Sequence, residues 1–207
     1  MEWTDLLPLL VAIFAAIGIP VALWSLRKGG QSKVDEFHQH LAGIGVDATV
    51  LSKDSPQQGK GRKGSWAQKV VGIIKLADSK IDSVNVIGVA SQYGVNYYLD
   101  YVVSRPTFAS AGKKKKTTMT TRKSRQFGGN VVDVGWKGDD YLAQRLSLDF
   151  GLKQKLLQAD LSALKGGISI HPEPKHDYAR IRTGYILPEP QLFEALDIIA
   201  DHVKSWY

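Results

Sequence analysis

Histidines and carboxylates between residues 171 and 177 are the group in this sequence whose types and spacing best suit metal chemistry. His171 and His176 flank Glu173 and precede Asp177, and across a hairpin such side chains could converge on zinc or manganese. The two prolines within the same stretch explain it equally well as a turn. We therefore keep His171 and His176 only as secondary metal candidates, and we predict no cofactor.

Signatures of the common enzyme classes are missing from the sequence. It has no GxSxG elbow and no HExxH helix, and it has no cysteine to serve as a nucleophile or thiolate ligand. The Gly-rich loop at 55–65 resembles a phosphate loop only in its spacing, because Ser65 stands where the essential lysine belongs. The sequence thus favours a protein that is not an enzyme. The alternative is an enzyme with a dispersed, metal-dependent site near the 171–177 hairpin.

A strongly basic segment at 110–129 is the feature with the clearest physical interpretation. The chain carries a formal net charge of +7 from 27 basic and 20 acidic residues. Seven of the basic residues lie in this segment, which has no acid, so the rest of the chain is balanced. These predicted anion-binding residues are Lys113, Lys114, Lys115, Lys116, Arg122, Lys123 and Arg125. We expect the segment to form a basic arm or loop that meets an anionic surface.

The first 28 residues have the pattern of a transmembrane helix. Between Asp5 and Arg27 the 21 residues carry no charge, and a helix of that length spans about 31 Å, close to the hydrocarbon thickness of a bilayer. Trp3 and Trp24 bracket the run, and Arg27 and Lys28 follow it, as expected of residues at the membrane interface. We predict an anchor at 1–28 rather than a cleaved signal peptide, whose apolar stretch would be shorter. The other alternative is a buried helix of the soluble core, because the uncharged run is at the usual length limit for such a helix.

The distribution of lysine and arginine around this stretch predicts an orientation. Acids precede it and basic residues follow it, so the N-terminus is expected outside and the domain in the cytoplasm of a single-pass cell-membrane protein. A tethered domain would lie near anionic lipid, which attracts each juxtamembrane Lys or Arg by about 1 kcal/mol. We therefore expect an accessory or interaction protein whose basic arm contacts anionic lipid headgroups or a membrane complex. Membrane-tethered nucleic-acid binding is the less favoured alternative, because the segment has few aromatic residues for base stacking.

Hydrophobic periodicity predicts an α+β fold: a single N-terminal transmembrane helix, a tether at 29–36, and one domain at 37–207 with a mainly antiparallel sheet covered by helices. Segments rich in β-branched and aromatic residues at 69–76, 83–91 and 95–105 are typical of an antiparallel meander. Further strands are expected at 46–52 and 128–136, and a hairpin around residues 172–176. Apolar residues at helical spacing predict helices at 33–43, 139–148, 149–164 and 190–204.

Residues 178–182 form an alternating strand with a basic face. Arg180 and Arg182 share that face with Tyr178, while Ala179 and Ile181 point the other way. The pattern is compatible with a shallow anion-binding surface, but it is also typical of the solvated face of a half-buried sheet. The sequence favours the solvated face.

Overall fold

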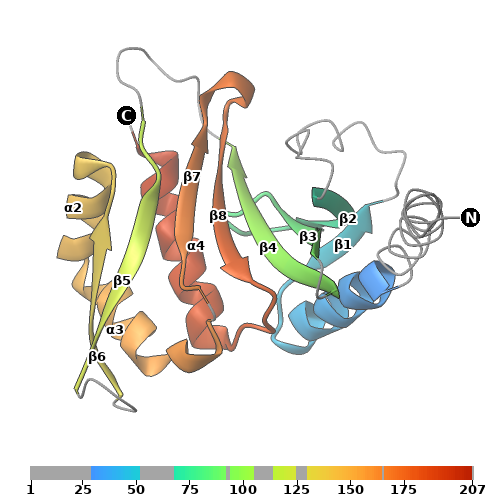
Figure 1. Ribbon diagram of the computed structural model, residues 1–207, viewed down its shortest axis with the longest axis horizontal. Helices are drawn as coiled ribbons and strands as arrows, with labels where there is room; N and C mark the ends of the chain where they lie inside the picture. Colours follow the sequence, from blue (N-terminus) through green and yellow to red (C-terminus); the bar gives the residue numbers. More distant parts are fainter. Residues whose placement is uncertain are drawn as a thin grey trace, which may run out of the picture.

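The computed structural model describes residues 29–51, 68–91, 94–104, 114–124, 130–164 and 166–206. These residues form an α+β fold built on one eight-stranded antiparallel sheet of order β1-β2-β3-β4-β8-β7-β5-β6 (Figure 1). The strands are β1 (Ala48–Leu51), β2 (Gln68–Leu76), β3 (Ser83–Ser91), β4 (Gly94–Ser104), β5 (Thr117–Lys123), β6 (Val131–Lys137), β7 (Ser169–Glu173) and β8 (Tyr178–Gly184). The predicted antiparallel sheet is confirmed.

The strands form where the sequence alternates, because one face of the sheet is buried against helices. On β4 the side chains of Leu99, Tyr101 and Val103 are fully buried on one face, which we call the first face. The intervening Tyr98, Asp100 and Val102 lie on the opposite, second face. Strands β2, β3 and β4 pair in sequence order as the predicted meander.

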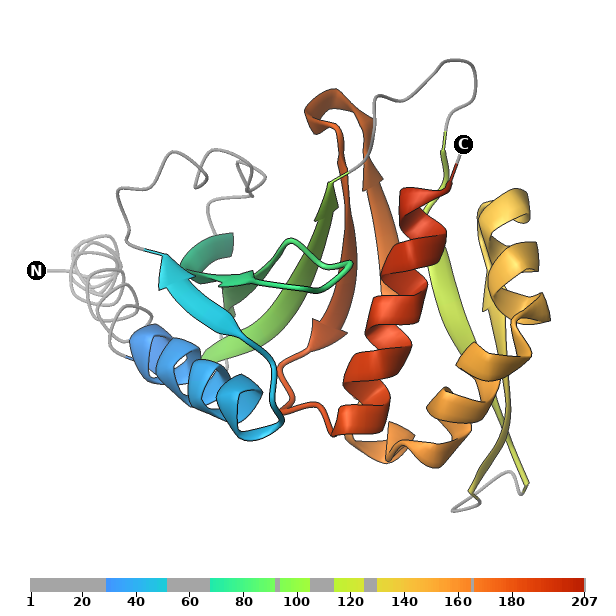
Figure 2. The same ribbon diagram turned by 180° about the vertical axis from the view of Figure 1, so that it is seen from behind.

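Four described helices pack on the first face. One runs through residues 29–43, and the others are α2 (Asp140–Leu148), α3 (Phe150–Gln158) and α4 (Pro190–Lys204). Two short 3-10 turns, η2 (Leu161–Ala163) and η3 (Pro174–His176), complete the described elements. Helix α4 crosses the middle of the sheet, behind β7 and β8 in Figure 1 and in front of them in Figure 2. Its buried stripe and the first face form one hydrophobic core.

The helix at 29–43 begins earlier than the predicted start at residue 33 and ends at residue 43, as predicted. Residues 29–36, predicted to be a tether, lie within it because Val34 is fully buried and packs where Gly72 of β2 leaves room. Just after the helix, Gly45 has a left-handed φ of 81°. There the N–H of Val46 donates to the Leu41 carbonyl and that of Gly45 to the Ala42 carbonyl, as in a Schellman motif.

One part of the predicted fold class is wrong. Within the ranges that the structure describes, no helix is both long and apolar enough to span a bilayer. The α+β sheet with helices is found, but the transmembrane helix that the prediction added to it is not. The segment 1–28, on which that prediction rested, lies outside the described residues.

The junction between β6 and α2 is held by two residues with different roles. Asp139 caps α2 by accepting a hydrogen bond from the Leu142 N–H, and it also accepts one from the indole Nε1 of the buried Trp206 at 3.1 Å. Gly138 has a φ of 137°, and a Cβ there would lie 2.0 Å from the carbonyl oxygen of Lys116. The chain after β6 can therefore touch the start of β5 only because residue 138 is glycine.

Gly138→Ala should destabilise the protein by about 2 kcal/mol or more, because it combines a strained backbone with a clash against backbone atoms. Gly43→Ala is the matched control, since its Cβ would meet nothing within 4 Å and its φ is ordinary. It should change the free energy of unfolding by less than about 0.5 kcal/mol. Urea unfolding of both variants measures the difference, and equal stability of the two would contradict the packing described for residue 138.

Candidate anion-binding site

The second face of the sheet is polar in its middle, although it is only partly open to solvent. Strand pairing sets Asp100 of β4 opposite Arg182 of β8, and Arg180 lies two residues further along β8. Asp100 and Arg180 are only 2% and 3% exposed. The basic face of β8, for which the sequence favoured full solvation, is therefore partly buried.

Four side chains form a buried ionic cluster there: Asp100, Glu173, Arg180 and Arg182. Asp100 accepts hydrogen bonds from Arg182 Nε at 2.6 Å, Arg182 Nη2 at 2.8 Å and Arg180 Nη1 at 2.8 Å. The other terminal nitrogen of Arg180 donates to Glu173. Burial favours the neutral form of Arg180, but the two carboxylates outweigh it and raise its pKa. Both acids of this cluster are thus neutralised by arginines beside them.

Ser169 and His171 lie next to this cluster on β7. The Ser169 hydroxyl and His171 Nε2 share a hydrogen bond of 3.0 Å. Burial lowers the pKa of His171 to about 4, with further lowering by the charges of Arg180, Lys116 and Arg182, and only Asp100 acts in the opposite direction. The imidazole is therefore neutral at pH 7, and it sits in a positive local potential.

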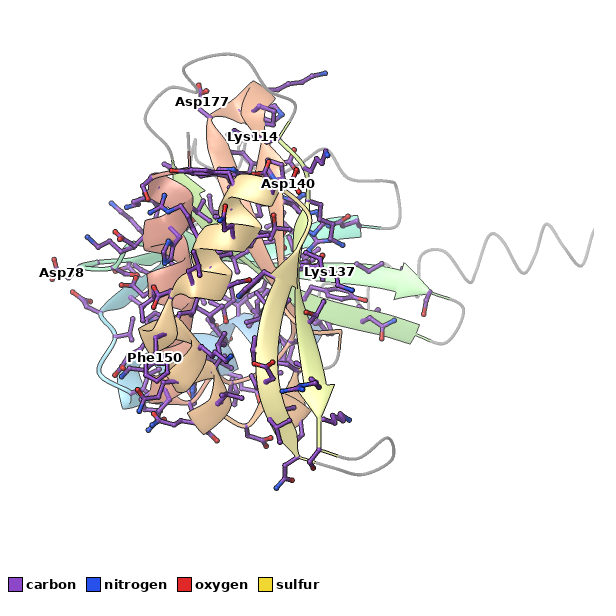
Figure 3. The ribbon with its side chains drawn as sticks, turned by 90° about the vertical axis from the view of Figure 1, so that its left-hand side faces the viewer. Asp78, Lys114, Lys137, Asp140, Phe150 and Asp177 are labelled. Atoms are coloured by element: carbon purple, nitrogen blue, oxygen red, sulfur yellow. The ribbon has the colours of Figure 1, made fainter. Side chains whose placement is uncertain are left out.

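Pairing across three strands brings two lysines to the same place. Lys137 of β6 lies opposite Thr118 of β5, which lies opposite Ser169 of β7. Lys116 precedes Thr118 by two residues on the same face, and its charge acts on His171. We call Lys116, Thr118, Lys137, Ser169 and His171 the β5 cluster. Figure 3 shows Lys137 on the side of the β5–β6 hairpin away from α2 and α3.

The predicted basic arm is divided by β5. Residues 117–123 are a strand within the sheet, with Thr117 and Met119 buried in the core. Lys114 lies over the Trp206 ring, 5.6 Å from its centroid, and the backbone N–H of Lys115 donates to Asp139. Lys114 and Lys115 are therefore positioned by the β6–α2 junction and lie at the opposite end of β5 from Arg122 and Lys123.

The remaining predicted site residues are separated from the β5 cluster or lie outside the described residues. Arg122 pairs with Asp133 across the hairpin at 3.5 Å, and Lys123 ends β5. Lys113, Arg125 and the predicted membrane-interface residues Trp3, Trp24, Arg27 and Lys28 lie outside the described residues. Of the predicted anion-binding residues that the structure describes, only Lys116 therefore belongs to the β5 cluster.

The secondary metal candidates do not converge. His171 bonds Ser169, and the ring of His176 stacks on Tyr178 with centroids 6.0 Å apart. Glu173 is engaged by Arg180. In the described part of the chain, no three or more histidines and acids lie together in a geometry that could hold a metal ion.

Sequence reasoning missed Thr118, Lys137, Ser169 and Asp100. Their juxtaposition depends on β5 lying between β7 and β6, a long-range arrangement that no local pattern reveals. One signal was present, because an acid at position 100 in an otherwise apolar and aromatic strand calls for a cationic neighbour. The alternating Arg180 and Arg182 were the available partners.

Comparison with known proteins adds no assignment. No protein-family model, no curated protein and no solved structure matches this chain. The function therefore has to be argued from the site itself.

His171→Gln should remove a pH-dependent loss of stability. The pKa of His171 is about 4 in the folded protein, against about 6.5 in an unfolded chain. Between pH 6.5 and 4 the unfolded state therefore binds a proton that the folded state does not. The contribution of the neutral imidazole is fully present above pH 6.5 and is lost as the pH falls to 4. Urea unfolding should show wild type losing stability relative to the variant across that window, and parallel curves would contradict the shift.

Proposed function

We propose that this domain is a non-catalytic binding module, whose β5 cluster holds a multiply charged, phosphate-bearing anion against the second face of the sheet. The observation that carries the proposal is the register that groups Lys116 and Lys137 with the hydroxyls of Thr118 and Ser169. Ammonium groups and hydroxyls are suitable donors for phosphate oxygens.

The electrostatic balance of the second face supports a ligand that is an anion. The strand acids on this face already have cationic partners: Asp100 and Glu173 bind the arginines of the buried ionic cluster, and Asp133 pairs with Lys153 at 2.6 Å. For Lys116 and Lys137, both exposed, the described residues supply no ion-pair partner. Their charges are therefore available to a ligand.

A nucleophilic enzyme is the second candidate, because the 3.0 Å contact between Ser169 and His171 has the geometry of a nucleophile and its base. The low pKa of His171 weakens this candidate, since an imidazole with a pKa of about 4 is a poor acceptor for the serine proton. In addition, no carboxylate bonded to its other nitrogen is seen in the described chain. We therefore favour binding over catalysis.

The phosphate could belong to a phospholipid headgroup or to a soluble compound. Two probes separate these sources: vesicles containing an anionic phospholipid, and pyrophosphate in solution. Vesicle capture without pyrophosphate binding would indicate a lipid surface, and the reverse would indicate a soluble ligand. Binding should weaken as salt rises, because the lysines are exposed.

Replacing both lysines, as Lys116→Gln with Lys137→Gln, should weaken binding of the preferred probe by about thirtyfold, at about 1 kcal/mol for each charge. Lys69→Gln with Lys175→Gln removes the same charge from two exposed positions outside the β5 cluster and should leave affinity within about threefold. Vesicle sedimentation and isothermal calorimetry measure the two cases.

Three results would overturn the proposal. Equal weakening in both double variants would mean that only net charge matters. Binding of neither probe would leave the β5 cluster without its ligand. Binding of a DNA or RNA oligonucleotide in preference to both probes would replace it with nucleic-acid recognition.

A further inference from the structure

Strand β5 extends beyond the end of its neighbour β7. Thr117 and Thr118 pair with β7, and the N–H of Met119 donates to the Ile168 carbonyl at 2.9 Å. From there to Lys123, β5 pairs only with β6 in the part of the chain that the structure describes. Figure 1 shows the β5–β6 hairpin projecting past the neighbouring strands. One edge of this projecting half therefore has no described strand beside it.

The backbone groups on that edge can be assigned from strand geometry. In an antiparallel strand, successive residues direct their N–H and C=O groups to opposite neighbours. Because Met119 directs its N–H toward β7, Thr121 and Lys123 direct theirs to the same side, whereas Thr120 and Arg122 face β6. The β6 side is regular as far as Arg122, after which the register shifts at a bulge. Thr121 and Lys123 thus present a short open edge, which we call the free edge of β5.

A groove of about 750 Å³ lies beside this edge, a volume within the range of ligand sites. Its walls include Thr121 and Lys123 on one side and residues of the segments 157–164 and 166–167 on the other. Gly166 and Gly167 both have left-handed φ values, 90° and 68°. They turn the chain just before β7 begins, so β7 does not continue alongside the rest of β5. The groove lies where a longer β7 would pair with β5.

The charges around the groove favour an acidic occupant. Lys123 is exposed in the groove wall, and Arg122 next to it is 76% exposed at its side chain and shares Asp133 with Lys153. Asp160, the acid in the groove wall, already accepts hydrogen bonds from the N–H and hydroxyl of Ser162. A second copy of β5 would bring the same two cations against themselves, which disfavours pairing between copies.

We propose that the free edge of β5 and its groove take up an extended segment of a partner protein, which adds as an antiparallel strand and carries acidic side chains. Main-chain hydrogen bonds to Thr121 and Lys123 would hold the segment. Because Arg122 and Lys123 lie on opposite faces of β5, acids at alternate positions of the segment would face one of the two. This site is separate from the β5 cluster, which lies at the opposite end of the strand on the second face. Failure of either proposal leaves the other intact.

Probe peptides test the strand addition directly. A peptide of alternating valine and glutamate should bind the full chain, and its N-methylated form, which lacks the backbone N–H groups, should bind at least about tenfold more weakly. A peptide of alternating valine and lysine should also bind more weakly than the glutamate peptide. Equal binding of the methylated peptide, equal binding of the lysine peptide, or no binding of the glutamate peptide would each overturn the proposal.

Variants at residue 121 locate the site. Thr121→Pro removes one edge N–H without removing a bond to β6, and proline is tolerated on edge strands. It should weaken the glutamate peptide by about tenfold, whereas Thr121→Val, which keeps the N–H, should bind as wild type does. Unchanged binding by the proline variant would overturn the proposal.

Amide hydrogen exchange gives a readout that does not depend on any variant's folding. In wild type, the amides of Thr121 and Lys123 should exchange faster than those of Thr120 and Arg122. Adding the glutamate peptide should slow the first pair selectively. Exchange that is uniform along the strand, or unaffected by the peptide, would contradict the free edge.

Discussion

The buried pairing of Asp100 with Arg180 and Arg182 is the interaction on which the second face depends. Three hydrogen bonds from two guanidinium groups converge on one carboxylate that is 2% exposed. Removing such charges from water costs several kcal/mol per ion, and the cost is offset only if every partner remains in place. Strands β4 and β8 must therefore keep their register. The register of β7 is fixed as well, because its Glu173 accepts a hydrogen bond from Arg180.

This cluster also determines the electrostatics outside it. Its acids form ion pairs with the arginines of the same cluster. Lys116 and Lys137 are therefore not neutralised by the carboxylates of their own face. The two lysines lie close together because Gly138 permits contact between the chain after β6 and the Lys116 carbonyl. Asp139 secures the same junction by bonding Leu142 and Trp206. The basic segment thus contributes Lys116 to the second face of the sheet, whereas its Arg122 and Lys123 lie in the projecting β5–β6 hairpin.

Local pattern was sufficient for much of the fold and insufficient for the site. The β-rich pattern of β4 and the helical spacing of α4 are short-range signals, and both elements form where the sequence predicts them. The burial of Arg180 was missed because its partner Asp100 is 80 residues away in the sequence. The strand at 117–123 was obscured by the lysines before it, although its threonines favour β structure. Which strands lie beside it in the sheet depends on tertiary packing, and no periodic pattern in the sequence reveals that packing.

The most direct test of the anion site is its location by a heavy oxyanion. In crystals of the protein soaked with tungstate, the anomalous signal should place the anion within about 3 Å of the ammonium group of Lys116 or Lys137 and of the hydroxyl of Thr118 or Ser169. Tungstate bound elsewhere on the protein, with none over β5 and β7, would contradict the account.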